Sequence, residues 1–142
     1  MKYFWLLVTV LFTLLIFYNS SMDISVSGSM SSYVTGFLLW LEQHVHLGFD
    51  AGADILEHNV RKLAHFIEFA ALCWFLCTTF TSFHVSNRTA SGYILFIGLL
   101  VAVIDEYIQL SAAGRSGRVM DVLLDFSGVL CMWLAYRMCQ KL

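Results

Sequence analysis

The sequence is poor in charged residues and contains no proline at all. Asp, Glu, Lys and Arg make up 13% of its 142 residues, about half the share that is usual in a soluble domain, whereas 59% of them are hydrophobic. This shortage of charge argues against an ordinary soluble domain and indicates a membrane protein. Low-complexity linkers and internal repeats are also missing, so residues 1–142 are predicted to form a single domain. The net charge of −2 offers no electrostatic attraction to nucleic acid.

A Cys-x-x-Cys pair is absent too, so neither a zinc ribbon nor a thioredoxin motif is supported. The four cysteines are Cys73, Cys77, Cys131 and Cys139. They lie within or just after apolar runs and are interpreted as small packing residues in a helix bundle. No cofactor is predicted from them.

Four apolar runs approach the roughly 20 residues that a helix needs to cross the hydrocarbon core. They cover residues 3–19, 62–83, 92–110 and 119–137. The predicted fold is therefore an all-α membrane protein, a bundle of four transmembrane helices. Gly92, Gly98 and Gly128 within these runs are interpreted as small residues at helix–helix contacts.

The segment between the first two runs, residues 19–60, contains no Lys or Arg. Phe37, Trp40, Leu41 and Val45 share one helical face there, but this apolar stretch is too short to span a membrane. It predicts a helix that lies at the membrane interface, with a re-entrant segment as the alternative. The eight Lys and Arg residues divide four against four between the two sides, so the positive-inside rule does not decide the orientation. The loop without Lys and Arg favours the outer side, and we expect both termini in the cytoplasm.

Polar and charged residues lie at three ends of these runs, and a four-span topology brings all three groups to the same side of the membrane. The groups are Arg61, Lys62, His65 and Glu68; Asp105, Glu106 and Gln109; and Arg115, Arg118, Asp121 and Asp125. Ionisable groups inside a membrane are costly and usually mark a functional site. At 1.5 Å per residue, Glu68, Asp105 and Asp125 would lie about 9–10 Å from their helix ends. They are therefore predicted to share one layer inside the bundle.

Several interpretations fit these eleven residues. Salt bridges between helices would use them only to hold the bundle together. A metal site could use His65 and Glu68 with the aspartates, but the cations at its mouth would repel a metal ion, so no metal is predicted. A proton or solute path is not indicated, because the residues are confined to one half of the membrane. The cations suit a phosphate group instead, so all eleven residues are candidates for ligand binding.

Within this set, side chains that can donate or accept protons are the candidates for catalysis. They are His65, Glu68, Asp105 and Asp121.

Three motifs in the same residues resemble those of VanZ-like proteins. They are Arg61-Lys62-x-Ala64-His65-Phe66-x-Glu68-Phe69, Asp105-Glu106-x-x-Gln109, and Arg115-x-x-Arg118-x-x-Asp121-x-x-x-Asp125-x-x-Gly128. The resemblance covers the whole chain, and Asp125 departs from it because asparagine is expected there. It implies a multi-pass protein of the bacterial cytoplasmic membrane. The family's namesake is associated with low-level resistance to teicoplanin, a glycopeptide that binds cell-wall precursors.

Three functions follow as hypotheses. In the first, an outward-facing polar pocket binds an anionic lipid or a lipid-linked cell-wall intermediate and contributes to teicoplanin resistance. In the second, the protein is an intramembrane lipid-phosphate hydrolase or transferase. In the third, it is a structural or partner-binding membrane protein whose charges join its helices.

Overall fold

The computed structural model describes residues 1–22, 36, 53–111 and 117–140. Its elements are the helices α1 (Lys2–Ser21), α3 (Ala53–Ser82), α4 (Asn87–Gln109) and α5 (Val119–Cys139). Each is long and apolar enough to cross a membrane, so the prediction of an all-α fold with four membrane-spanning helices is confirmed. The interfacial helix predicted around Phe37 and Trp40 lies outside the described residues.

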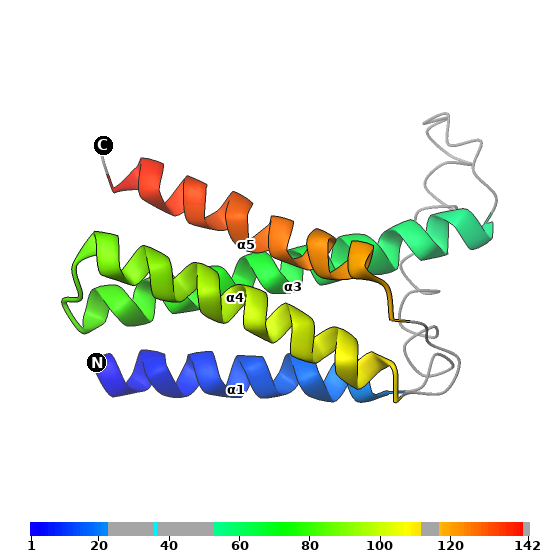
Figure 1. Ribbon diagram of the computed structural model, residues 1–142, viewed down its shortest axis with the longest axis horizontal. Coiled ribbons are helices and arrows are strands. Elements are labelled where there is room, and N and C mark those ends of the chain that lie inside the picture. Colours follow the sequence, from blue (N-terminus) through cyan, green and yellow to red (C-terminus); the bar gives the residue numbers. More distant parts are fainter. Residues whose placement is uncertain (23–35, 37–52, 112–116, 141–142) are drawn as a thin grey trace.

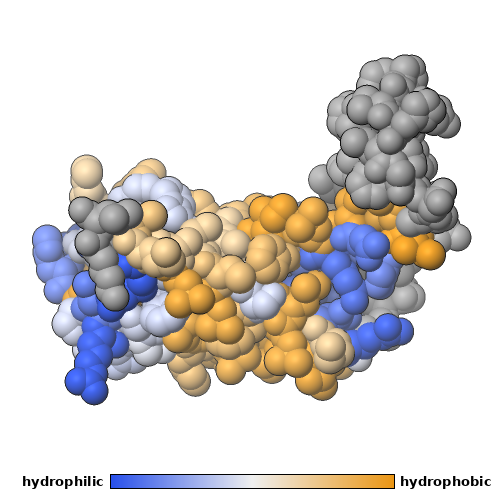
Figure 2. Space-filling model, turned by 90° about the horizontal axis from the view of Figure 1, so that it is seen from above, coloured by the Kyte–Doolittle hydropathy of each residue, from blue (hydrophilic) through white to orange (hydrophobic). Residues whose placement is uncertain are grey.

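The four helices run alternately up and down, so that both termini lie at the same end of the bundle (Figure 1). The helix α3 packs against each of the other three, and its largest contact is with α5. The surface in Figure 2 has an apolar band between two hydrophilic ends, as expected for helices that cross a hydrocarbon layer. We call the end that carries the chain termini the terminal end, and the other the loop end.

Two helices begin earlier than predicted. The helix α3 starts at Ala53 rather than at residue 62, because its polar first turns continue beyond the apolar run. The helix α4 starts at Asn87 rather than at residue 92, where Ser86 is the N-cap and its side chain accepts a hydrogen bond from the backbone N–H of Thr89. Hydropathy marks only the apolar part of a helix and therefore misses both extensions.

The core of the bundle is formed mainly by α3. Phe69, Leu72 and Cys73 are completely buried there, and Val129 of α5 is buried against them. Between 17 and 33% of each span is buried within the protein, which leaves most apolar side chains to be covered by lipid. Packing between helices therefore has to come from close contacts and interhelical hydrogen bonds rather than from the hydrophobic effect.

Two of the three glycines lie at close helix–helix contacts, as predicted. A Cβ atom at Gly98 would lie 2.7 Å from Cγ1 of Val129, and one at Gly128 would collide with the backbone carbonyl of Phe66. Gly128 therefore allows α5 to approach the backbone of α3. The interpretation of Gly92 as a packing residue is wrong, because Gly92 is exposed and a Cβ atom there would have no neighbour within 4 Å.

Candidate functional site

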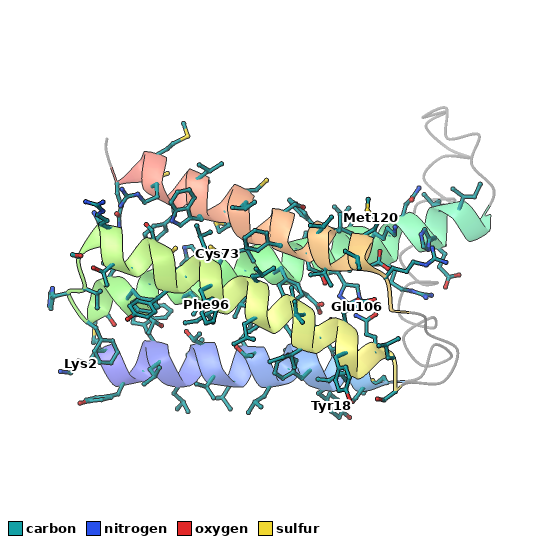
Figure 3. All side chains as sticks on the ribbon, in the orientation of Figure 1. Lys2, Tyr18, Cys73, Phe96, Glu106 and Met120 are labelled. Atoms are coloured by element: carbon teal, nitrogen blue, oxygen red, sulfur yellow. The ribbon has the colours of Figure 1, made fainter. Side chains whose placement is uncertain are left out.

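A cluster of ionisable side chains lies near the loop end of the bundle, where α3 and α5 begin and α4 ends. Glu106 is labelled there in Figure 3, far from Lys2 at the terminal end. We define the polar cluster as six residues from three helices: His65 and Glu68 of α3, Asp105 and Glu106 of α4, and Asp121 and Asp125 of α5. The helix directions explain why residues so distant in sequence meet, since each of these segments reaches the same end of the bundle.

The centre of the polar cluster is buried. Asp105 is 0% exposed and Asp125 is 2% exposed. A ring nitrogen of His65 and one carboxylate oxygen each from Asp105 and Asp125 all lie within 4.8 Å of one another. The amide of Gln109 donates a hydrogen bond to Oδ2 of Asp105 over 2.8 Å, one helical turn away, as the spacing of the two residues predicts. The structure thus brings the sequence-predicted groups of all three helices together.

The carboxylates of the polar cluster repel one another. Asp105 and Asp125 come from different helices and bring carboxylate oxygens within 4.8 Å of each other. Carboxylates that share a buried site cannot all be charged unless a cation or hydrogen-bond donors lie between them. His65, Asp105 and Asp125 are close enough to bind one divalent cation, although the sequence predicted no metal.

Cationic residues line the outer edge of the polar cluster, and we call Arg61, Lys62 and Arg118 its rim. Arg61 forms an ion pair of 3.1 Å with Glu57 on its own helix. Lys62 forms one of 3.4 Å with Asp121 of α5. The carboxylate of Glu106 accepts a hydrogen bond from the backbone N–H of Arg118, which ties the end of α4 to the start of α5.

Two rim side chains have hydrogen-bonding groups to spare. The Nε atom of Arg61 is buried and has no hydrogen-bond partner among the described residues. The exposed side chain of Arg118 forms no ion pair within this part of the chain. Arg115 lies outside the described residues.

The first helix also contributes to the site, which the sequence analysis missed. Asn19 donates a hydrogen bond of 3.2 Å to Oε1 of Glu68, whose Oε2 lies 3.5 Å from Nδ1 of His65. Asn19 could have been predicted, because the first span ends on the same side of the membrane as the charged groups. Glu57 was missed as well, although its spacing of four residues from Arg61 is typical of an ion pair on a helix.

Comparison with known proteins adds a family to this geometry. The family described as VanZ/LLP1 matches residues 4–140, which include all four helices and the polar cluster. Searches of curated proteins and of solved structures gave no match. The protein is thus a multi-pass membrane protein that belongs to the VanZ/LLP1 family.

Proposed function

We propose that this protein binds the anionic headgroup of a membrane lipid, or of a lipid-linked cell-wall intermediate, at the rim of the polar cluster. The observation that carries the proposal is the buried Nε atom of Arg61, a charged donor with no partner among the described residues. Buried donors are normally satisfied, so such an atom points to a group that the protein binds. A guanidinium can hold a phosphate through two parallel hydrogen bonds, one of them from this atom.

The existing ion pairs leave room for such a ligand. The side chains of Arg61 and Glu57 are 27 and 32% exposed, and those of Lys62 and Asp121 are 39 and 29% exposed. Ion pairs at this exposure contribute about 0–1 kcal/mol, whereas a hydrogen bond to a charged group contributes about 1.5–3 kcal/mol. A phosphate that approaches the rim can therefore displace the pairing partners. The carboxylates below would keep it at headgroup depth.

The orientation and the biological role belong to the same proposal. With both termini in the cytoplasm, the loop end faces the outer surface of the cytoplasmic membrane, where lipid-linked cell-wall intermediates are exposed. A protein that holds such a lipid there would change how much of it a glycopeptide can reach. We therefore extend the proposal to teicoplanin resistance, the phenotype associated with the namesake of the family.

Substitution of the rim arginines by lysine tests the proposal. Lysine keeps the charge but lacks the planar donors, so Arg61→Lys and Arg118→Lys should lose the lipid bound at the rim, and resistance with it, while the protein still inserts and folds. Co-purifying lipid is measured by native mass spectrometry, and resistance by the inhibitory concentration of teicoplanin. Arg88→Lys, an exposed arginine at the terminal end, is the matched control. The same number of bound lipids in both rim variants as in the wild type would contradict the proposal and favour a structural role of the charges.

A second candidate function is that of a lipid-phosphate hydrolase or transferase. The specific observation in its favour is that a ring nitrogen of His65 and carboxylate oxygens of Asp105 and Asp125 lie within 4.8 Å of one another. An imidazole beside carboxylates can accept a proton from an attacking water or hydroxyl group, and a divalent cation held by the same atoms could polarise a phosphate. Purified protein would then turn over a lipid phosphate, with Mg²⁺ or Mn²⁺ supplied, and His65→Ala would abolish turnover. Binding without turnover in the wild type would reject this candidate.

A further inference from the structure

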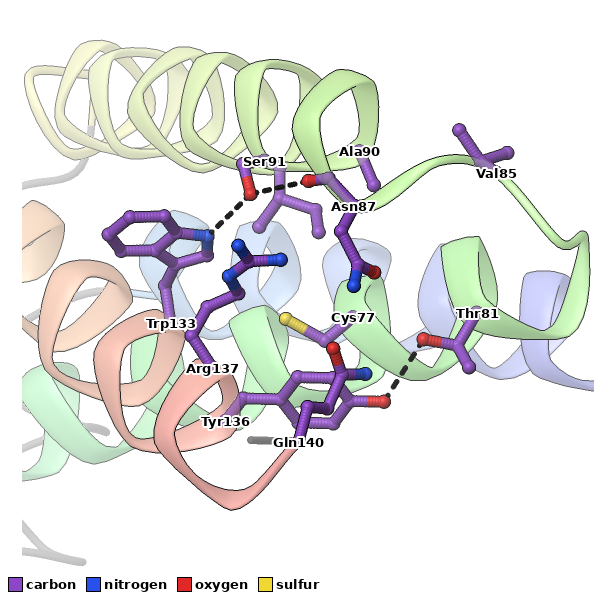
Figure 4. Close-up of a pocket in the computed structure, with 11 residues that line it drawn as sticks. Cys77, Thr81, Val85, Asn87, Ala90, Ser91, Trp133, Tyr136, Arg137 and Gln140 are labelled. Atoms are coloured by element: carbon purple, nitrogen blue, oxygen red, sulfur yellow. Dashed lines mark hydrogen bonds between the residues drawn. The ribbon is translucent and has the colours of Figure 1, made fainter. Parts of the chain in front are cut away.

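A polar hollow lies at the terminal end of the bundle, far from the polar cluster. It is formed by the end of α3, the start of α4 and the end of α5 (Figure 4). Its volume, including the part that is open to solvent, is about 290 Å³. Its lining includes the apolar side chains of Cys77, Ile94 and Trp133 and the polar side chains of Asn87 and Gln140. The hollow is open and fits one small polar group.

Arg137 of α5 provides the charge of this hollow. Its guanidinium extends from α5 into the space beside Trp133 and Asn87 (Figure 4). The side chain is partly buried and forms no hydrogen bond or ion pair with the described residues. A cation that is partly removed from water gains most from an anionic partner with hydrogen-bond acceptors.

Among the described residues, no side-chain carboxylate lies at this end beside Arg137. The Asp and Glu residues that the structure describes lie in α3 up to Glu68, at Asp105 and Glu106 of α4, and at Asp121 and Asp125 of α5, toward the loop end. The residues at the terminal end include Lys2, Arg88 and Arg137 instead. The first turn of α4 also lines the hollow through Asn87 and Ala90, and the positive end of the helix dipole adds to the potential there. The described residues therefore offer Arg137 no side-chain carboxylate as a counter-ion.

From these observations we infer that the hollow binds a phosphate group and that the phosphate belongs to an anionic phospholipid in the adjacent leaflet. The guanidinium of Arg137 and the amides of Asn87 and Gln140 supply hydrogen-bond donors, and the apolar part of the lining suits the boundary between headgroup and acyl chain. The hollow sits where a membrane-spanning helix ends, which is the depth of lipid phosphates. Basic pockets between transmembrane helices are a recognised way to bind lipid headgroups. This inference is independent of the function proposed for the loop end.

Titration of the purified full-length protein in detergent tests this inference. Short-chain phosphatidylglycerol, phosphatidylcholine and inorganic phosphate are added separately, and binding is followed by native mass spectrometry and by the midpoint of thermal unfolding. We expect phosphatidylglycerol to bind and to raise the midpoint, with phosphatidylcholine weaker. Inorganic phosphate that binds as well as phosphatidylglycerol would overturn the assignment to lipid and leave a site for free phosphate.

Substitutions of Arg137 and Arg88 test whether phosphatidylglycerol binds in the hollow. Arg137→Gln should weaken phosphatidylglycerol binding by about tenfold or more, the loss expected for a charge-assisted hydrogen bond. Arg88→Gln makes the same charge change on an exposed residue outside the hollow and should stay within about twofold of the wild type. An equal loss in both variants, or no loss in Arg137→Gln, would overturn the inference.

Two further variants cover the remaining outcomes. Arg137→Lys keeps the charge and serves as the test variant if Arg137→Gln does not fold. It should bind phosphatidylglycerol several-fold more weakly than the wild type, because lysine lacks the planar donors of the guanidinium. Unchanged affinity in this lysine variant would overturn the role given to the guanidinium. Because the rim can bind lipid too, the titration is repeated with Arg61→Lys. Binding that persists in Arg61→Lys but is lost in Arg137→Gln belongs to the terminal end.

Discussion

Gly128 is the position at which the smallest change should have the largest effect on the bundle. A methyl group there would collide with the carbonyl oxygen of Phe66 and would lie 3.3 Å from the backbone nitrogen of Ala70. Both atoms belong to the backbone of α3, so neither can turn aside as a side chain would. The substitution Gly128→Ala should therefore push α5 away from α3.

The size of the effect follows from two opposing contributions. Alanine is favoured over glycine within a helix by about 0.5–1 kcal/mol. Overpacking costs about 1–3 kcal/mol, and more when the obstacle is backbone. The net result for Gly128→Ala should be a destabilisation of about 1–2 kcal/mol or more. Because the polar cluster depends on the same α3–α5 contact, ligand binding at the rim should decline as well.

The other two glycines provide a graded control. Gly98→Ala meets a methyl group of Val129 at 2.7 Å, an obstacle that can move slightly, so its effect should be smaller. Gly92→Ala meets nothing within 4 Å and should be neutral or slightly stabilising. In thermal unfolding in detergent, Gly92→Ala should have the highest midpoint, Gly98→Ala a lower one, and Gly128→Ala the lowest. A Gly128→Ala protein as stable as Gly92→Ala would refute the close approach of α5 to α3.

Two other predictions concern the ion pair between helices and the orientation of the protein. Reversal of one charge, Lys62→Glu or Asp121→Lys, should lower the midpoint of thermal unfolding, because the two side chains form an ion pair of 3.4 Å between α3 and α5. The double reversal should recover part of that loss. A double variant that is no more stable than the single variants would show that the pair does not join the helices. A cysteine placed at the exposed Ser111, in a background without the four native cysteines, should react with a membrane-impermeant maleimide on intact cells. A cysteine at Asn87 should react only after permeabilisation, and its labelling on intact cells would reverse the proposed orientation.

The charged residues show which side-chain contacts can be predicted from the spacing of residues in the sequence. The contact between Asp105 and Gln109 follows from a separation of four residues on one helix and was predictable. The pairing of Arg61 with Glu57 obeys the same rule and was overlooked. The pairing of Lys62 with Asp121 obeys no such rule, because the rotation of α3 relative to α5 decides it, and that rotation depends on which side chains pack between them.

The sequence by itself determined that this protein has four apolar helices and that its carboxylates gather at one end. Both properties depend on quantities that run along the chain: the length of each apolar run, and the alternating direction of successive spans. Hydropathy does not register the polar first turns of α3 and α4, so their true starts at Ala53 and Asn87 became known only from the structure.

Only the tertiary structure decided which side chains meet. It placed His65 beside Asp105 and Asp125, added Asn19 from α1, and left Arg137 in a hollow with no carboxylate among its described lining residues. It also distinguished Gly128, which faces a neighbouring backbone, from Gly92, which faces outward. The physical reason is common to these cases: contacts between helices depend on rotation and on close packing, which are set by all the neighbours together and not by the spacing of residues within one helix.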